Sequence, residues 1–197
     1  YPSSTEVNGT ALATGDYPEH SHVIANNEYH PEIDPLQAVP MQSLDSVRRG
    51  DEATGGKYIA VPTLAERLHA RNETTAIVGA KPVALLHDRK MRGDESPNPV
   101  WFADGSLPPS RLETLTNLLG IFPAATSPDV GRDAWAARCL TEFFWRDTLP
   151  RYSVLWLSEP DLSQHKHGPG STEALAAIRN CDDRLATVLR ELDRRGL

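Results

Sequence analysis

Short apolar segments alternate with amphipathic segments along this chain. Two of the apolar segments, Thr74–Gly79 and Tyr152–Leu157, have the length and the polar boundaries that predict buried strands. Apolar residues recur at helical spacing in three longer segments, 112–119, 133–146 and 172–192. We therefore expect an α/β fold with a mostly parallel sheet and helices on both faces. In such sheets, ligands bind at the carboxyl ends of the strands.

The other segments predict fewer regular elements. Residues 1–38 are rich in Pro, Gly, Asn and His, and we expect a loop there with at most one short helix near Thr10–Thr14. The sequence Thr63-Leu-Ala-Glu66 is a capping box and predicts the start of a helix. Residues 89–109 are polar and contain several prolines, so we expect an exposed excursion.

Composition and charge favour a single globular domain and argue against a nucleic-acid-binding protein. The chain has 197 residues, of which 39% are hydrophobic, enough for the core of one domain. Its net charge of -7 argues against nucleic-acid binding, which depends on clustered Lys and Arg. A small phosphorylated substrate is compatible with this charge, because bound metal ions reverse the local sign. Cys139 and Cys181 lack metal-ligand spacing and are expected to pack in the interior. No apolar run approaches the roughly 20 residues of a membrane-spanning helix.

A cluster of polar residues directly follows the second predicted strand. Asp161 and His165 offer a carboxylate and an imidazole, a pairing that suits zinc or another divalent transition metal. Pro160 and Gly168-Pro-Gly170 would hold the intervening loop in a fixed shape. From spacing alone, a polar loop between a strand and a capped helix explains the cluster equally well. His167 is expected to be solvated or to support the site indirectly.

A second group of polar residues lies at the start of the chain. It contains Thr5 within Tyr1-Pro-Ser-Ser-Thr-Glu-Val-Asn8, and Thr14-Gly-Asp-Tyr-Pro-Glu19 follows. A threonine hydroxyl becomes a useful nucleophile only when a base or a metal lowers its pKa. Considered alone, Thr5 has the character of an ordinary loop or capping residue.

Together, the two groups resemble motifs of the type I phosphodiesterase/nucleotide pyrophosphatase family, within the alkaline phosphatase superfamily. Members carry a nucleophile segment of the Y/F-P-T-K-T-F-P-N-H type, then T-G-x-Y-P-E-x-H-G, and later E-P-D-x-x-x-H-x-x-G-P. The corresponding residues here, in the same order, are Tyr1 to Asn8, Thr14 to Glu19, and Glu159-Pro-Asp161 with His165, Gly168 and Pro169. The resemblance extends over essentially the whole chain and implies an alkaline-phosphatase-like αβα sandwich.

The resemblance implies a metal-dependent hydrolase of phosphodiesters, nucleotide pyrophosphates or phosphomonoesters. Thr5 resembles the metal-bound nucleophile, which would form a covalent phospho-threonine intermediate, and Asn8 resembles the side chain that hydrogen-bonds a phosphoryl oxygen. Asp161 and His165 resemble two ligands of one cation. Two divalent metal ions, expected to be zinc, are therefore the implied cofactors. A small phosphorylated molecule is the implied substrate.

Other ligands of the family's metal sites have no match in these residues. Family members place one metal-binding Asp before the nucleophile, and an S-D-H-G motif and a further His after the last helix. No S-D-H-G occurs here. We therefore expect residues 1–197 to be a single partial catalytic domain from a larger enzyme, without flanking strands at either end and inactive alone. Its nucleophile segment is expected at 1–38 and its metal-ligand strand, loop and helix at 152–195.

The sequence departs from the family pattern near the expected nucleophile. Glu6 and Val7 replace the usual Phe-Pro, so substrate contacts there are expected to differ, and Gly9 stands where a His is common. Four further histidines are expected to pack or to stabilise loops rather than to bind metal: His20, His22, His30 and His87.

Two alternative functions stay open. A phosphonate hydrolase of the same superfamily would use a similar scaffold, and a non-catalytic domain could keep the fold while binding a ligand. The retention of Thr5, Asn8, Asp161 and His165 together favours an enzyme, because a purely structural role has no need of this combination. Because members of this family are often exported, we expect a periplasmic or extracellular location.

Overall fold

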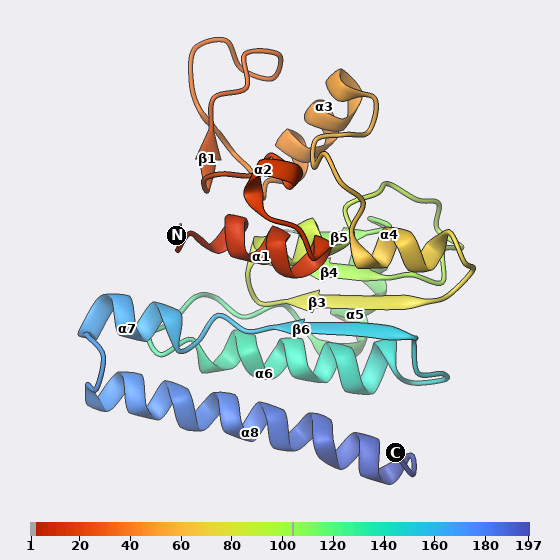
Figure 1. Ribbon diagram of the computed structural model, residues 1–197. Helices are drawn as coiled ribbons and strands as arrows, with labels where there is room; N and C mark the ends of the chain where they lie inside the picture. Colours follow the sequence, from red (N-terminus) through yellow and green to blue (C-terminus); the bar gives the residue numbers. More distant parts are fainter. Residues whose placement is uncertain (1–2, 104) are drawn as a thin grey trace.

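The computed structural model describes residues 3–103 and 105–197 and contains a four-stranded sheet with helices on both faces (Figure 1). The strand order is β5 (Gly105–Leu107), β4 (Val100–Phe102), β3 (Thr75–Gly79) and β6 (Tyr152–Trp156). β3 runs parallel to both β4 and β6, whereas β5 runs antiparallel to β4. The predicted α/β class and mostly parallel sheet are confirmed.

The central strand β3 contributes to two hydrophobic cores, because alternate side chains of a strand point to opposite faces. Ile77 belongs to one core together with Val83, and Ala76 and Val78 belong to the other together with Trp135. These five side chains are all buried. β3 is therefore covered on both faces, as its nearly uninterrupted apolar sequence predicts. The prediction that Tyr152–Leu157 is also a buried strand is only partly right, because β6 lies at the edge of the sheet and all its residues are partly exposed.

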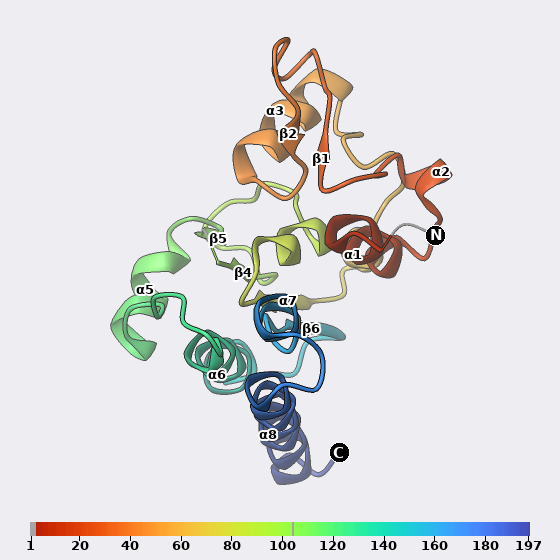
Figure 2. The ribbon, with the colours of Figure 1, turned by 90° about the vertical axis from the view of Figure 1, so that its left-hand side faces the viewer.

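Helices flank the sheet in separate layers (Figures 1 and 2). One face carries α1 (Thr5–Thr14), α4 (Leu64–His69) and the 3₁₀ helix η1 (Pro82–His87). The other face carries α5 (Arg111–Leu119), α6 (Val130–Arg138) and its π-helical continuation η2 (Cys139–Phe144), with α8 (Thr172–Arg194) packed on α6. α7 (Asp161–His167) lies beyond the carboxyl end of β6. A smaller group of elements lies beyond α1, away from the sheet: α2 (Pro18–Ser21), β1 (Asn27–Glu28), β2 (Val39–Pro40) and α3 (Leu44–Thr54).

The prediction of a loop with at most one short helix over residues 1–38 is wrong. A ten-residue helix begins at Thr5, and α2 follows it. Threonine, asparagine and glycine have weak intrinsic helix propensity, so the sequence gives little local signal. Tertiary packing supplies the stability: a Cβ added to Gly9 would lie 2.8 Å from Val83 Cγ2 and 3.5 Å from Trp156 Cη2. This close approach leaves no space for a side chain at Gly9.

The predicted exposed excursion over residues 89–109 is also wrong in its second half. Val100, Phe102 and Leu107 are fully buried, in the interior strand β4 and the edge strand β5. Strands of three residues are too short to show a period, which is why the sequence does not reveal them. In the first half, Arg89 is buried and donates a hydrogen bond to the Glu66 carboxylate at 2.6 Å.

The predicted helix starts have different outcomes. The capping box is confirmed, since Thr63 accepts from the Glu66 backbone N–H and the Glu66 side chain accepts from the Thr63 N–H. Ser171 likewise caps α8. Ser110 does not cap α5, although the helix itself forms, because the Ser110 hydroxyl donates to Asp94 at 2.6 Å instead.

The apolar face of α8 is only partly covered. Ala174 and Ala177 are the buried residues of this helix, and small side chains allow it to lie close to its neighbours. Four larger side chains are between 45% and 54% exposed: Leu175, Ile178, Leu185 and Leu189. Within the described ranges, no helix has the length and apolar character needed to cross a membrane.

Candidate metal and nucleophile site

The carboxyl ends of β3 and β6 and the amino end of α1 lie at the same end of the sheet (Figure 1). The backbone N–H of Ala80, which follows β3, donates to the Trp156 carbonyl at 2.8 Å. Lys81 comes next in the chain, and its Nζ lies 2.5 Å from Asp161 Oδ2. Asp161 is therefore located beyond the carboxyl end of a strand, as the sequence predicts.

The geometry of Asp161 and His165 suits a divalent cation. The two residues lie one turn apart on α7, with His165 Nε2 3.3 Å from Asp161 Oδ1. Two zinc ligands with bonds of about 2.0–2.1 Å and a tetrahedral angle would be about 3.3–3.4 Å apart. The His165 side chain is 82% exposed and that of Asp161 is 49% exposed, so the pair is accessible from solvent. The donor atoms present therefore fit one cation.

These two residues form an incomplete ligand set. Across residues 3–103 and 105–197, no group of three His, Cys, Asp or Glu side chains could hold a metal ion. His167 lies apart from the pair, with its Nε2 3.0 Å from the Ser127 hydroxyl.

A buried network supports the loop that carries Asp161. Asp133 Oδ1 accepts from the backbone N–H of Ser158 at 2.7 Å, and Asp133 Oδ2 accepts from that of Glu159 at 3.2 Å. Glu159 in turn accepts from the Ser163 N–H of α7 at 3.0 Å. Burial raises the pKa of Asp133, while these hydrogen bonds act in the opposite direction. Glu159 thus helps to fix the loop that carries Asp161.

The expected nucleophile is the first residue of α1. Thr5 is half-buried, and the N–H groups of this helical end favour anions. One hydrogen of the Asn8 amide is donated to the Ser4 carbonyl at 2.9 Å. No direct contact between Thr5 and Asp161 is observed in the described residues. Lys81 interacts with both parts of the candidate site. Its ammonium group pairs with Asp161, and its positive charge acts on the Glu6 carboxyl group at the start of α1.

Sequence reasoning missed Asn26. Its Oδ1 accepts a hydrogen bond from the Glu6 backbone N–H at 3.2 Å, although the two residues are twenty positions apart. The Asn26 amide nitrogen thereby remains a donor beside the first turn of α1. The sequence around Asn26 contains only an Asn-Asn pair in a segment predicted to be a loop. Such a pair is too common to identify a site.

Glu6 differs from the other acidic residues near the site. It is 2% exposed, and its Oε2 has no hydrogen-bond partner within the described ranges. Burial raises its pKa, and the nearby positive charge of Lys81 partly opposes that effect. A buried carboxyl group therefore stands next to Thr5, where the family usually has a phenylalanine.

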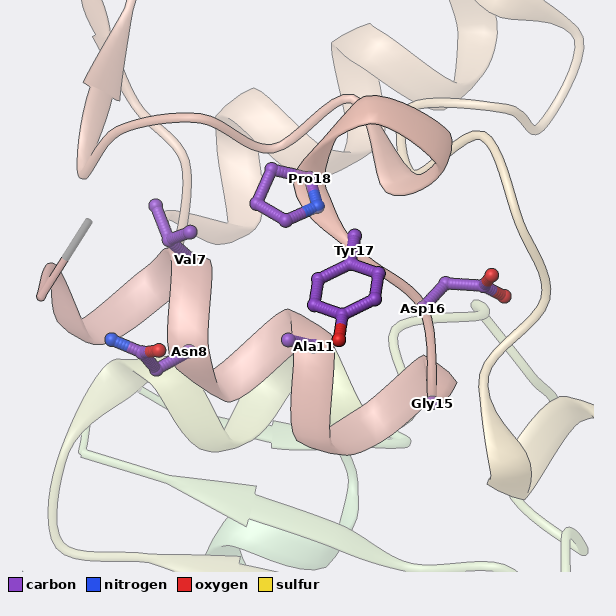
Figure 3. Close-up of a pocket in the computed structure, with 7 residues that line it drawn as sticks. All are labelled: Val7, Asn8, Ala11, Gly15, Asp16, Tyr17 and Pro18. Carbon is purple, nitrogen blue, oxygen red and sulfur yellow. The ribbon is translucent and has the colours of Figure 1, made fainter. Parts of the chain in front are cut away.

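A pocket of about 230 Å³ lies between α1 and the segment that leads into α2 (Figure 3). Val7, Asn8 and Ala11 line it from the helix, and the opposite wall is formed by residues 15–18. Within that wall Tyr17 is 70% exposed, so its ring is available to a ligand.

Four of the other histidines, those expected to pack or to stabilise loops, lie apart from Asp161 and His165. Each has a local contact or position of its own: His20 Nδ1 is 3.2 Å from Asp16, His22 ends α2 with a left-handed backbone (φ 63), His30 Nδ1 is 2.9 Å from Glu32, and His87 packs against Trp156. These contacts agree with the packing and loop-stabilising roles expected for them.

Comparison with known proteins identifies the relatives of this chain. The sequence profile described as type I phosphodiesterase/nucleotide pyrophosphatase matches residues 1–197. Ectonucleotide pyrophosphatase/phosphodiesterase family member 1 of Homo sapiens is 25% identical over 193 residues, which cover 96% of this chain and 16% of that protein. Venom phosphodiesterase 2 of Crotalus adamanteus is 24% identical over 201 residues, which cover 100% of this chain and 20% of that protein.

A solved structure shares the fold. Phosphonoacetate hydrolase from Sinorhizobium meliloti 1021, in complex with phosphonoacetate, aligns with a TM-score of 0.65 and 20% identity, covering 96% of this chain and 43% of that one. The predicted alkaline-phosphatase-like architecture is confirmed by this likeness. The chain spans less than half the length of each of these relatives.

Proposed function

Because the chain belongs to the type I phosphodiesterase/nucleotide pyrophosphatase family, we propose that it carries the nucleophile and two metal ligands of a phosphoric ester hydrolase. The observation that carries this proposal is the 3.3 Å approach of His165 Nε2 to Asp161 Oδ1, at the end of the sheet where α1 begins. The substrate class is small phosphorylated molecules with a diester, pyrophosphate or monoester bond. The name of a venom relative supports a location outside the cytoplasm.

Asp161 and His165 would hold one divalent cation, and their oxygen and nitrogen donors suit zinc. A second cation is proposed at the Thr5 hydroxyl. Divalent cations supply Lewis acidity at such a site, lowering the pKa of a bound hydroxyl and stabilising negative charge on phosphoryl oxygens. The chain spans a minor part of its relatives, so we expect further ligands outside these 197 residues and little activity from these residues alone.

In the proposed reaction, the Thr5 oxygen attacks phosphorus while the bond from phosphorus to the leaving-group oxygen breaks. The hydroxyl proton passes through solvent to the departing oxygen, and the phosphoryl group is left bonded to the Thr5 oxygen. Water then attacks phosphorus and the bond from phosphorus to the Thr5 oxygen breaks, which releases the phosphoryl product and returns a proton to Thr5. The amino end of α1 would orient the anionic phosphoryl group through its backbone N–H groups. Asn8 is the proposed side-chain donor to a phosphoryl oxygen, because its amide nitrogen has a second hydrogen beside the one donated to Ser4. Asn26, whose oxygen accepts from the Glu6 N–H, is proposed as a second donor at the same helical end.

The pocket beside α1 is proposed to receive part of the group esterified to the phosphate. Its lining combines the apolar side chains of Val7 and Ala11 with the exposed ring of Tyr17, which offers a flat surface for stacking. The helix that begins with Thr5 also lines this pocket, through residues two to six positions further along.

Phosphonate hydrolysis is the second candidate function. The likeness to phosphonoacetate hydrolase supports it, with a TM-score of 0.65 over 96% of this chain. In this reaction the bond that breaks joins phosphorus to carbon, and the departing carbon must be protonated.

The test uses the full-length gene product that contains this chain, with added zinc. Hydrolysis of bis-p-nitrophenyl phosphate, p-nitrophenyl phosphate and phosphonoacetate is measured for the unchanged protein, Thr5→Ala and Asp161→Asn. Two matched controls, Thr114→Ala and Asp182→Asn, change exposed residues of the same types outside the site.

We expect zinc-dependent turnover that both site variants reduce by at least about 100-fold, since nucleophile and cation each contribute several kcal/mol. The preferred substrate then assigns diesterase, monoesterase or phosphonate activity. Full activity of Thr5→Ala would refute the threonine mechanism. Absence of turnover on all three substrates, with zinc bound, would favour a non-catalytic binding domain.

A further inference from the structure

Lys81 is the cation nearest to the candidate metal ligands. Its Nζ lies 2.5 Å from Asp161 Oδ2, although the two residues are eighty positions apart in sequence. The Lys81 side chain is only 19% exposed, whereas exposed ion pairs usually involve two solvated side chains. One partner of this ion pair, Lys81, is therefore largely withdrawn from solvent.

The backbone fixes where Lys81 stands. The residue lies two positions after the end of β3 and directly before η1, whose first residue is Pro82. The preceding residue, Ala80, donates its N–H to the Trp156 carbonyl at the end of β6. The Lys81 backbone is thereby held next to the loop that carries Asp161. The ion pair with Asp161 orders the Lys81 side chain before a ligand binds.

The two oxygens of Asp161 have different partners. Oδ2 accepts from Lys81, whereas Oδ1 lies 3.3 Å from His165 Nε2. Metal-ligating carboxylates are themselves commonly hydrogen-bonded, and such partners fix the direction in which the ligand atom points. If the Lys81 ammonium group occupied the place of a metal cation, it would be expected on Oδ1, the oxygen that faces His165. Lys81 is on Oδ2 instead.

From this division of oxygens, and given the metal site of the proposed function, we infer that Lys81 is a positioning residue. It holds Asp161 through Oδ2 so that Oδ1 and His165 Nε2 face one cation. Lys81 acts through Asp161 and does not itself coordinate metal.

The test measures Co²⁺ and Zn²⁺ binding to the full-length gene product by calorimetry, together with the visible absorption of the Co²⁺ form, which reports its coordination geometry. The variants are Lys81→Met, Lys81→Arg and Lys166→Met. Lys166 is an exposed lysine next to His165, so its removal measures the general effect of deleting a nearby positive charge. Asp161→Asn shows which binding event belongs to the site.

We expect Lys81→Met to weaken metal binding about 10- to 100-fold and to alter the Co²⁺ absorption, as loss of a supporting contact does. Lys81→Arg should restore part of the affinity, because it can still donate to Oδ2. Lys166→Met should strengthen metal binding slightly, because it removes a positive charge that repels the cation. This effect is opposite in direction to the one expected for Lys81→Met. Unfolding in urea, measured without metal, should show that Lys81→Met remains folded.

Equal or tighter binding by Lys81→Met, while Asp161→Asn abolishes binding, would overturn the positioning role and leave the metal site intact. If neither the unchanged protein nor any variant binds Co²⁺ or Zn²⁺, the metal site of the proposed function is wrong, and the role of Lys81 is wrong with it.

Discussion

The carboxylate of Asp133 on α6 holds the backbone of Ser158, accepting from its N–H at 2.7 Å and from its hydroxyl at 2.8 Å through the same oxygen. Both residues are buried, and Ser158 lies three positions before the candidate ligand Asp161. A helix on one face of the sheet thus fixes the loop that bears the site, which leads to the first prediction.

We expect Asp133→Asn to destabilise the protein by about 2 kcal/mol, because an amide can keep one acceptor but places a second donor against the Glu159 N–H. Urea unfolding compared with the exposed Asp182→Asn measures the difference. A loss below about 0.5 kcal/mol, within the range of surface substitutions, would contradict the role assigned to this network.

The second prediction separates the two functions of the Asn26 amide. Asn26→Asp keeps an oxygen that can accept from Glu6 but replaces the donor with a negative charge. In the full-length protein we expect a loss of kcat/KM of about 100-fold with little change in stability, as for the removal of one oxyanion donor. The neighbouring exposed Asn27→Asp is the matched control. Equal kinetics of the two variants would exclude Asn26 from substrate binding.

The third prediction concerns stability at acid pH. His87 is 1% exposed and packs against Trp156, and burial lowers its pKa from 6.5 to about 4. The unfolded chain therefore binds the proton more tightly, so the free energy of unfolding decreases as the pH falls from 6.5 to about 4 and levels off below that. The shift corresponds to roughly 3 kcal/mol.

Urea unfolding between pH 4 and pH 7.5 measures this dependence. His87→Phe should remove most of it, whereas substitution of the exposed His20 by Asn should not. Because the comparison uses the slope against pH, a constant cost of repacking Phe does not affect it. An unchanged slope in His87→Phe would contradict the neutral, buried state of His87.

The fourth prediction concerns Glu6, whose effect on the free energy of unfolding depends on pH in the direction opposite to that of His87. Burial raises the pKa of Glu6, so the folded state binds its proton more tightly than the unfolded chain does. The free energy of unfolding should therefore decrease as the pH rises from the unfolded value of 4.5 through the higher folded value. Glu6→Gln should be more stable than the unchanged protein at pH 7 and about equal at pH 4. Glu113→Gln, an exposed change in the first turn of α5, is the control, and equal responses would refute this prediction.

Much of the fold is readable in the sequence. The strands β3 and β6 are five-residue apolar runs, and α4 carries a capping box, so local chemistry determines each of them. The helix α1 and the short strands β4 and β5 are not readable in this way. They depend on contacts with residues far along the chain, such as that between Gly9 and Val83.

The same distinction between local sequence signals and long-range contacts applies to the candidate site. The sequence by itself determined which chemical groups are proposed for the site, since Thr5, Asp161 and His165 are predicted from residue type, spacing and resemblance to family motifs. Only the tertiary structure decided that Asn26 reaches the first turn of α1 and that Lys81 reaches Asp161. The physical reason is that motif residues are close in sequence, whereas these partners are twenty and eighty positions apart and meet only when the sheet and its helices are assembled.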